Sequence, residues 1–264
     1  MIPGLSATAE ARLQSALTPV VTAVGQDSFA DRDFEFLTGR DPQSNALGIH
    51  LLDGPDLMLV VTDPDRPVGN LRIQTGGPGN LLFIDNRGWH GNLNGVIRIL
   101  GRDCTVFFNT VTGGGLVGLT DLFMRSNEQF LYWGLGATAV ECSIEIEGEG
   151  RGVAIGDDAL ISNGVWVRNH NMHALWDLVT DSPIGRQPVT TVVERHVWLG
   201  QDALLLNCPS IGHGSVIGAR SLVNGPIPAR VAAAGTPARV LREQVSWGRD
   251  TYRMTDAERR LLGP

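Results

Sequence analysis

The stretch IGDDALISNGVWVRNHNM, residues 155–172, and the stretch VERHVWLGQDALLLNCPSIGHGSVIGARSLVNGPIP, residues 193–228, repeat one pattern every six residues. An aliphatic residue opens each sextet, and a small or β-branched residue usually stands four places later, as at Ala159, Val165 and Ala203. An amphipathic helix has no such period, because its apolar positions recur three and four residues apart. The pattern is typical of a short flat strand followed by a tight turn.

Three such sextets close one triangular coil of a parallel β-helix, so residues eighteen apart are expected to stack. Leu199 then lies over Ile217 and Leu205 over Val223, about 4.8 Å apart along the axis. Aliphatic columns fill the inside, and each coil is stabilised mainly by its neighbours. An ordinary β-sandwich would instead need alternation over longer strands with irregular turns. The sequence therefore predicts an all-β protein built on a parallel β-helix.

Composition and charge agree with this fold and narrow the function. Glycine is abundant, at 33 of 264 residues, as repeated tight corners require, while aromatic residues make up 6%. A narrow β-helix interior is expected to exclude most rings. The net charge of -7 argues against a nucleic-acid-binding protein, because no basic stripe is present to neutralise phosphates.

The compartment is inferred from what the sequence lacks. The start, MIPGLSATAEARLQ, has no basic segment leading into an apolar one, and no apolar run reaches the length of a membrane span. The three cysteines, Cys104, Cys142 and Cys208, are far apart and are expected to be buried thiols in a reducing compartment. We therefore expect a cytoplasmic protein.

The chain divides into three predicted regions. They are an N-terminal α/β segment, residues 1–70, a β-helix domain, residues 71–236, and a C-terminal tail, residues 237–264. Ala7–Val24 has helical spacing, and residues 48–67 read as a pair of strands. In the tail, Thr255 can cap a short helix with Glu258 three places on, and this helix can pack on the β-helix or on a neighbouring subunit.

Four segments together resemble a known family. They are the sextets, NHNMH at 169–173, HVWLGQDALLL at 196–206 and AAAGTPARVLRE at 232–243. They look like the left-handed β-helix acyltransferases, the hexapeptide-repeat group that includes galactoside and maltose acetyltransferases and the O-acetyltransferases of bacterial surface polysaccharides. The resemblance covers about Gly152 to Glu243 and is only architectural before that. It implies left-handed coiling. The short helical attachments expected at both ends come from the helical spacing of Ala7–Val24 and the capping pair of Thr255 and Glu258.

The break between the two repeat stretches, a loop at about 168–192, is the expected place for catalysis. The resemblance puts the catalytic histidine of the family on His173, which would act as general base toward an acceptor hydroxyl. Asp177 is a candidate to fix its tautomer. His170 can bind the acceptor or the loop backbone. Trp198 is expected to face outward, where it either forms a wall of the catalytic pocket or packs beneath the loop.

In this family, CoA lies in a groove between adjacent subunits. The resemblance implies pantetheine contacts at Gln201, Ala219 and Asn224, a backbone contact at the Thr236 turn, and phosphate contacts at Arg239 and Arg242. The alternatives are ordinary repeat positions for the first group and a solvated tail for the arginines. The chain departs from the family where Asn224 and Gly225 replace a frequent Thr-Lys pair, which puts a phosphate contact there in doubt.

The expected function is an acetyl-CoA-dependent O-acetyltransferase that acts on a sugar hydroxyl of a polysaccharide or glycoside. We expect direct transfer in a homotrimer, without a metal. One alternative is an N-acetyltransferase acting on an amino sugar or antibiotic. Another is a zinc protein like the γ-class carbonic anhydrases, with His170, His173 and His196 as conceivable ligands. Five arginines in the front half can form a pocket for an acidic sugar or be solvated on coil edges: Arg72, Arg87, Arg98, Arg102 and Arg125.

Overall fold

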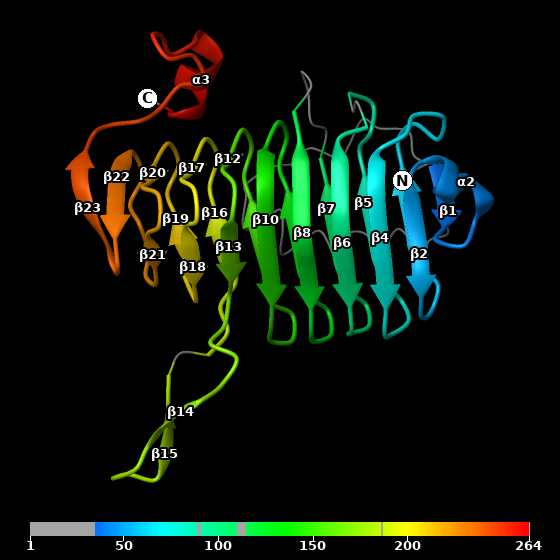
Figure 1. The fold of residues 1–264 in the computed structure, drawn as a ribbon, viewed down its shortest axis with the longest axis horizontal. Helices are drawn as coiled ribbons and strands as arrows, with labels where there is room; N and C mark the ends of the chain where they lie inside the picture. The colour runs from blue at the N-terminus through cyan, green and yellow to red at the C-terminus, as the bar shows by residue number, and fades with distance from the viewer. Residues whose placement is uncertain (1–34, 89–90, 110–114, 186, 264) are drawn as a thin grey trace.

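The computed structural model describes residues 35–88, 91–109, 115–185 and 187–263. In this part of the chain, strands stack coil upon coil into a parallel β-helix (Figure 1). The strands of the first sheet are, in spatial order, β1 (Glu35–Thr38), β3 (Met58–Val61), β5 (Leu81–Ile84), β7 (Thr105–Phe108), β9 (Phe130–Trp133), β11 (Gly152–Ile155), β16 (Thr191–Val193) and β19 (Ser210–Ile211). The prediction of an all-β, parallel β-helical fold is confirmed.

A second sheet forms the other side of the β-helix, and its strands follow a main path with one branch. Its main path is β2 (Ile49–Asp53), β4 (Gly69–Thr75), β6 (Leu93–Ile99), β8 (Val117–Met124), β10 (Thr138–Ile146), β12 (Leu160–Ile161), β17 (Trp198–Leu199), β20 (Val216–Ile217), β22 (Val231–Gly235) and β23 (Ala238–Glu243). A branch contains β13 (Val165–Arg168), β18 (Leu204–Leu206) and β21 (Leu222–Val223).

The division occurs at β10, because this long strand pairs with both β12 and β13. Before β10 the coils have long strands and irregular corners. After it, each coil follows the sextets and has three short faces. The stacking expected from the repeat is observed, since Leu199 pairs with Ile217 and Leu205 with Val223.

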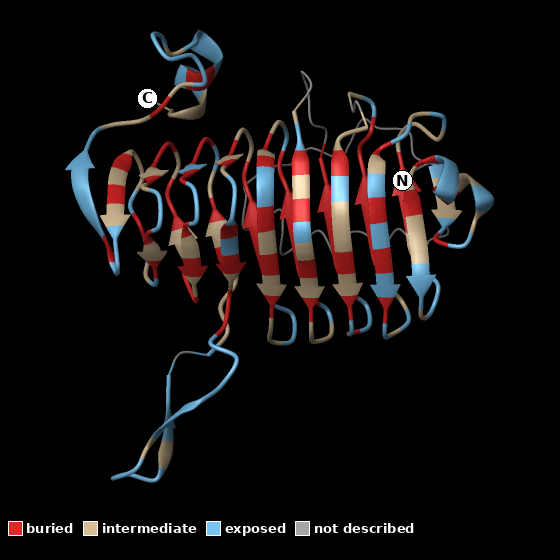
Figure 2. Ribbon diagram, in the orientation of Figure 1, coloured by how far each residue is buried: buried red, intermediate tan, exposed pale blue. Residues whose placement is uncertain are grey.

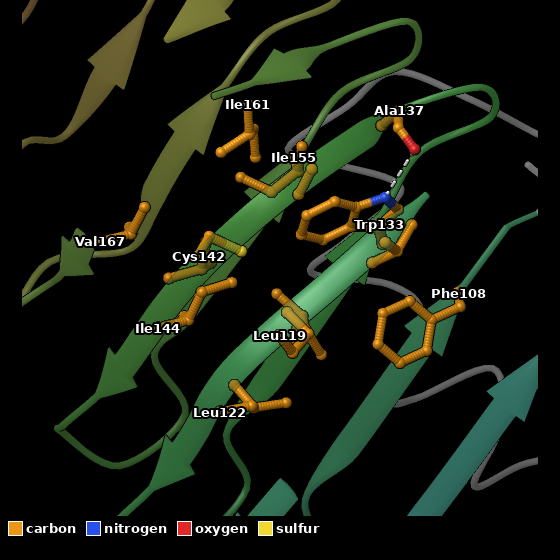
Figure 3. Close-up of a cluster of buried hydrophobic side chains, with 14 of the residues drawn as sticks. Phe108, Leu119, Leu122, Trp133, Ala137, Cys142, Ile144, Ile155, Ile161 and Val167 are labelled. Carbon is orange, nitrogen blue, oxygen red and sulfur yellow. Dashed lines mark hydrogen bonds between the residues drawn. The ribbon is translucent and has the colours of Figure 1, made fainter. Parts of the chain in front are cut away.

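The inside of the β-helix is one continuous apolar core. It contains rings as well as aliphatic side chains, because the earlier coils are wide enough for Phe108 and Trp133 (Figure 3). Trp133 is fully buried, and its indole N–H donates to the carbonyl oxygen of Ala137 at 3.0 Å. The expectation that rings are excluded from the interior is therefore wrong for these coils.

A second apolar cluster lies on the other face of the first sheet. Phe83, Phe107 and Tyr132 stack there along successive coils, with ring centres 4.3 and 5.3 Å apart. Strands such as β9, with the sequence FLYW, are thus buried on both faces. This accounts for their continuous apolar runs, which differ from the alternation of half-exposed strands.

The parallel coils begin earlier than the predicted boundary at residue 71. β2 already pairs in parallel with β4, and β3 with β5, so the segment read as a separate strand pair belongs to the β-helix. It lacks the sextet pattern because its corners are irregular. A five-residue helix, α2 (Pro42–Ala46), precedes β2. The helix expected over Ala7–Val24 lies outside the described residues.

The C-terminal tail folds back over the coils. β23 runs antiparallel to β22, and the chain then leads to α3 (Asp256–Leu261). The predicted capping of this helix is confirmed, because Thr255 and Glu258 form a reciprocal capping box. Arg249 binds Asp158 with its Nη2 at 2.8 Å, which ties the tail to the β-helix of its own chain. Neither helix in the described ranges is long and apolar enough to cross a membrane.

The place of His196 in a sextet, two residues before Trp198, predicts a surface side chain, but the structure buries it fully beneath this tail. One ring nitrogen lies 2.7 Å from Asp158 Oδ2 and the other 2.9 Å from the carbonyl oxygen of Trp247. The rings of His196 and Trp247 stack with centres 4.4 Å apart. Trp247 follows His196 by 51 residues, so the local sequence gave no sign of this cover.

Candidate active site

The predicted catalytic loop leaves the β-helix after β13 and returns at β16. It carries a hairpin, β14 (Leu175–Asp177) and β15 (Ser182–Ile184), which projects away from the coils (Figure 1). Most hairpin residues are exposed (Figure 2).

Asn169 fastens both ends of this loop to one point of the wall. Its side-chain N–H groups donate to the carbonyl oxygens of Glu147 and Val189, at 2.9 and 2.8 Å. Its side-chain oxygen accepts from the Glu147 amide at 2.8 Å. Asn169 is itself fully buried, so the loop starts from a fixed position.

A pocket of about 230 Å³ lies at the base of the loop. It is lined by Glu147, which directly follows β10, and by His170 and His173. The remaining lining residues are Asn171, Met172, Ala174, Pro183, Ile184, Gly185, Gln187 and Pro188. The structure thus brings the two histidines of NHNMH together in one pocket.

His170 is buried, with 2% of its surface exposed. Its Nδ1 accepts a hydrogen bond from the Met172 amide at 3.0 Å, which places the proton of the neutral ring on Nε2. Nε2 lies 3.7 Å from Glu145 Oε2. Desolvation lowers the pKa of His170, and the positive charge of Arg168 lowers it further, so the neutral ring is favoured.

His173 has a different setting. It is exposed, and its backbone amide donates to the carbonyl oxygen of Asn171 at 2.6 Å. Asp177, the expected partner of its ring, instead accepts from the amides of Val179 and Thr180 at 2.8 and 3.0 Å. These hydrogen bonds lower the pKa of Asp177 and show that its carboxylate holds the hairpin turn. The expectation that Asp177 orients His173 is not supported.

Four charged residues beside the pocket were not singled out together from the sequence. Arg168 lies 3.1 Å from Glu145, and Arg125 lies 3.9 Å from both Glu145 and Glu147. These residues come from neighbouring strands, and Glu145 is in register with Arg168. The outward acidic positions of SIEIEGE were a visible signal, but the irregular coil length before β13 hid their partners.

The candidate cofactor residues lie on different edges of the regular coils. Gln201, Ala219 and the Thr236 turn follow β17, β20 and β22, which are stacked on one another. Gln201 accepts the Arg220 amide at 2.8 Å through its backbone, and its side chain is exposed. Asn224 follows β21 instead, in the branch that begins at β13. It therefore lies on the same edge as the start of the loop.

Arg239 and Arg242 both lie on β23 and are exposed. Arg239 pairs with Ala234 and Arg242 with Ala232, with a register shift between the two pairs. The extra residue, Leu241, makes both arginines project to the same side although they are three residues apart. Two guanidinium groups on one face suit an anionic ligand such as a diphosphate.

Trp198 faces outward as expected, with 38% of its surface exposed. Its indole N–H donates to Ser162 Oγ at 3.1 Å, and its ring centre lies 6.1 Å from that of Trp247. It therefore packs beside the C-terminal tail.

The conceivable three-histidine metal site is not assembled, because His196 is held by Asp158 and Trp247 rather than beside the other two histidines. Across the described ranges, no three His, Cys, Asp or Glu side chains gather as a metal site requires.

Comparison with known proteins agrees with the repeat and the fold. No family model matches the chain. The galactoside O-acetyltransferase of Escherichia coli K12 is 39% identical over 93 residues, which are 34% of this chain and 44% of that protein. The polysialic acid O-acetyltransferase of Escherichia coli O1:K1 / APEC is 30% identical over 112 residues, 42% of this chain and 36% of that protein. The chain thus spans less than half the length of these two relatives.

One solved structure shares the fold at a TM-score of 0.52. It is the polySia-specific acetyltransferase NeuO, which is 20% identical, with 69% of this chain and 91% of that chain covered. By its repeat, its fold and these partial matches, the chain is similar to the hexapeptide-repeat β-helix acetyltransferases.

Proposed function

We propose that the protein transfers acetyl from acetyl-CoA to a hydroxyl group of a sugar, in a polysaccharide or a simpler glycoside. The observation that carries this proposal is the pocket at the base of the loop, where two histidines meet beside a regular hexapeptide β-helix. The names of the relatives, which are O-acetyltransferases of galactosides and polysialic acid, support the same chemistry.

The reaction needs a base, because a sugar hydroxyl is a poor nucleophile at neutral pH. We propose His173 for this role. Its ring is exposed in the pocket and makes no hydrogen bond with the described residues, so a ring nitrogen is free to accept the hydroxyl proton. The hydroxyl oxygen then attacks the thioester carbonyl, and backbone amides stabilise the oxyanion. When the C–S bond breaks, the His173 imidazolium returns the proton to sulfur and CoA leaves as the thiol.

His170 would then be a positioning residue. Its Nδ1 lone pair is occupied by the Met172 amide, so it holds the turn that carries His173. One observation favours His170 as the alternative base: a carboxylate, Glu145, stands 3.7 Å behind its Nε2. In that arrangement the acceptor hydroxyl would have to replace the Met172 amide at Nδ1.

For the donor, we propose that CoA lies along the regular coils, with its pantetheine chain near Gln201 and Ala219 and its phosphates near Arg239 and Arg242. The support is the placement of both arginines on one side of β23. Arg239 and Arg242 form no ion pair with the described residues, so their charge is available. Asn224 and Thr236 are proposed as further contacts.

We also propose a homotrimer in which the projecting hairpin contacts a neighbouring subunit. Leu178 and Val179 at its tip are 89% and 94% exposed, and apolar side chains this exposed commonly mark an interaction site. Light scattering after gel filtration measures the assembly directly, and a monomer would reject this part of the proposal.

The test of function is release of CoA from acetyl-CoA over a panel of sugar acceptors and matched amino sugars. We expect release that depends on a hydroxyl acceptor. His173→Asn should abolish kcat while CoA binding persists, and His170→Asn should leave measurable activity. The reverse order of the two variants would assign the base to His170. Release only with amines would favour an N-acetyltransferase. A protein that neither binds CoA nor releases it from acetyl-CoA would reject the proposed acetyltransferase.

A further inference from the structure

We infer that residues 244–249, the corner strap, position the proposed donor site, with Trp247 as their anchor. The inference rests on the proposed function, because it concerns how β23 presents Arg239 and Arg242. β23 is the last strand on the main path of the second sheet, where β22 is its partner. Ala238 is its one buried residue. A strand with so few buried contacts opens easily on its own, so its position depends on what holds its ends.

The corner strap follows a column of coil corners (Figure 1). Gln244, with a φ of 53°, turns the chain out of β23 and into this column. The corner residues precede the stacked strands β10, β12, β17, β20 and β22, and all have a left-handed φ of 54° to 70°: Gly136, Asp158, His196, Gly214 and Arg230. One such corner in each coil gives a row parallel to the axis of the β-helix.

Successive strap residues donate to the backbone carbonyl oxygens of successive corners. The pairs are Val245 N to Arg230 at 3.0 Å, Ser246 Oγ to Gly214 at 2.8 Å, Trp247 Nε1 to His196 at 2.9 Å and Arg249 Nη2 to Gly136 at 3.4 Å. Backbone carbonyl groups need a donor where water is excluded. A shift of the strap by one residue would break these hydrogen bonds together, so the strap fits the column in one register.

Trp247 is the anchor because it is buried and is bound to His196 in both directions. It is 6% exposed. Its indole N–H donates to the His196 carbonyl oxygen, and its own carbonyl oxygen lies 2.9 Å from a ring nitrogen of His196. The two rings are stacked with an interplanar angle of 8°. Beyond it, the Arg249 Nε donates to Asp158 Oδ1 at 2.9 Å, so the anchor region is tied to two neighbouring corners.

The anchor fixes the end of β23 that carries Arg242. Arg242 pairs with Ala232, and the strap begins two residues later. Guanidinium groups bind a diphosphate more tightly when they are held in place beforehand, because ordering them on binding costs affinity. The ring centre of Trp247 also lies 6.1 Å from that of Trp198, on the strand that precedes Gln201. The strap thus reaches the proposed donor contacts on β17 as well as those on β23.

The acceptor side of the proposed reaction is separate from the corner strap. None of residues 244–249 is among the described residues that line the pocket of His170 and His173. Loss of the strap should therefore weaken donor binding and spare the acceptor and the base. A general loss of folded protein would instead lower the apparent kcat and leave KM unchanged.

The test is Trp247→Ala in the full chain. Affinity for CoA is measured by calorimetry, and kcat and KM by CoA release from acetyl-CoA. We expect the Kd of CoA and the KM of acetyl-CoA to rise about tenfold or more, with kcat and the acceptor KM unchanged. Hydrogen exchange of the β23 amides should also become about tenfold faster. Trp247→Phe keeps a ring over His196, so it should return the Kd of CoA to within about threefold of the wild type.

Tyr252→Ala is the matched control, because it removes a ring from the same tail at a position that is 95% exposed. It should change neither the affinity for CoA nor exchange in β23. Ser246→Ala is the milder variant, since it removes only the hydrogen bond of Ser246 Oγ to Gly214. Exchange of the β23 amides should rise about fivefold in this variant, as the loss of one hydrogen bond implies.

Unchanged affinity for CoA in Trp247→Ala, or a fall in kcat with KM unchanged, would overturn the inference. An equal effect of Tyr252→Ala would also overturn it. If Trp247→Ala does not fold, exchange in Ser246→Ala decides, and a rate equal to that of the wild type rejects the strap as a support of β23. If the wild type neither binds CoA nor releases it, the proposed function fails, while exchange in β23 still shows whether the strap holds that strand.

Discussion

Replacing Asn169 by alanine should open the base of the loop without unfolding the coils. The substitution deprives three backbone groups of their partners: the amide and the carbonyl of Glu147 and the carbonyl of Val189. An unpaired buried backbone group costs about 1–3 kcal/mol. Because water can enter at a loop, we take about 1 kcal/mol for each group, or about 3 kcal/mol in all. The ratio of open to closed loop should then rise about 100-fold.

Hydrogen exchange at the Val189 amide reports this opening, because that amide donates to the backbone carbonyl oxygen of Asn169 at 3.1 Å, a hydrogen bond that the substitution does not remove. Its exchange rate should rise about 100-fold with the open population. The melting temperature should change little, since each coil is stabilised mainly by its neighbours. Under the proposed function, kcat/KM should fall by a similar factor, as the pocket is lined by residues of both ends of the loop.

Asn163→Ala is the matched control, because Asn163 is exposed and donates only to the Glu141 side chain at 2.7 Å. It should leave exchange at the Val189 amide unchanged. If Asn169→Ala exchanges no faster than this control, the loop is not fastened by Asn169. If the whole β-helix unfolds instead, the coils depend on this residue more than a stack of neighbouring coils should.

Three further predictions follow from the fold and the pKa shifts. Gly95→Ala should lower the free energy of unfolding by at least about 3 kcal/mol, because φ is 149° and a Cβ would overlap a carbonyl of the next coil. The control is Gly136→Ala, at φ 69° with open space around it, which should cost about 1 kcal/mol. Equal urea midpoints for the two variants would contradict this prediction. Burial raises the pKa of Cys104 to about 11 and of Cys142 to about 12, so a thiol reagent at pH 8 should label neither until the protein is denatured; rapid labelling of the native protein would be inconsistent with burial. The pKa of His170 is lowered by burial, so the stability that its neutral ring contributes is present above the usual histidine pKa and is lost as the pH falls below it. Between pH 7 and pH 5 the wild type should therefore lose more free energy of unfolding than His170→Asn. Parallel curves of unfolding free energy against pH would refute the buried neutral ring.

The regular half of the fold could be predicted from the sequence because its information is local. A sextet specifies one strand and one corner, so the pairing of Leu199 with Ile217 follows from counting. The earlier coils have no fixed period, and β2 and β3 therefore looked like a separate strand pair. Their wide interior also accepts Trp133, which a narrow sextet coil would not.

The sequence likewise predicted one part of the candidate site and not the rest. The NHNMH segment is a local signal, and the structure places both of its histidines in one pocket. The pairing of Arg168 with Glu145 depends on the length of an irregular coil, so it was not visible from spacing. The burial of His196 depends on a residue of the tail, and such long-range cover has no local signature.

The pocket lies between the irregular coils and the regular coils of the β-helix. It lies where β10, the last long strand, divides into β12 and β13 at the start of the regular coils. Glu147 comes from the irregular side and the histidines from the loop that follows β13, while Arg239 and Arg242 lie on β23, beyond the repeat. The surfaces proposed for the donor therefore lie on the sextet coils and on β23, whereas Glu147 in the proposed acceptor pocket comes from a coil outside the repeat. Because the two proposed surfaces come from different parts of the chain, we expect substitutions in β10 and its neighbours to change acceptor preference and to leave the proposed CoA site intact.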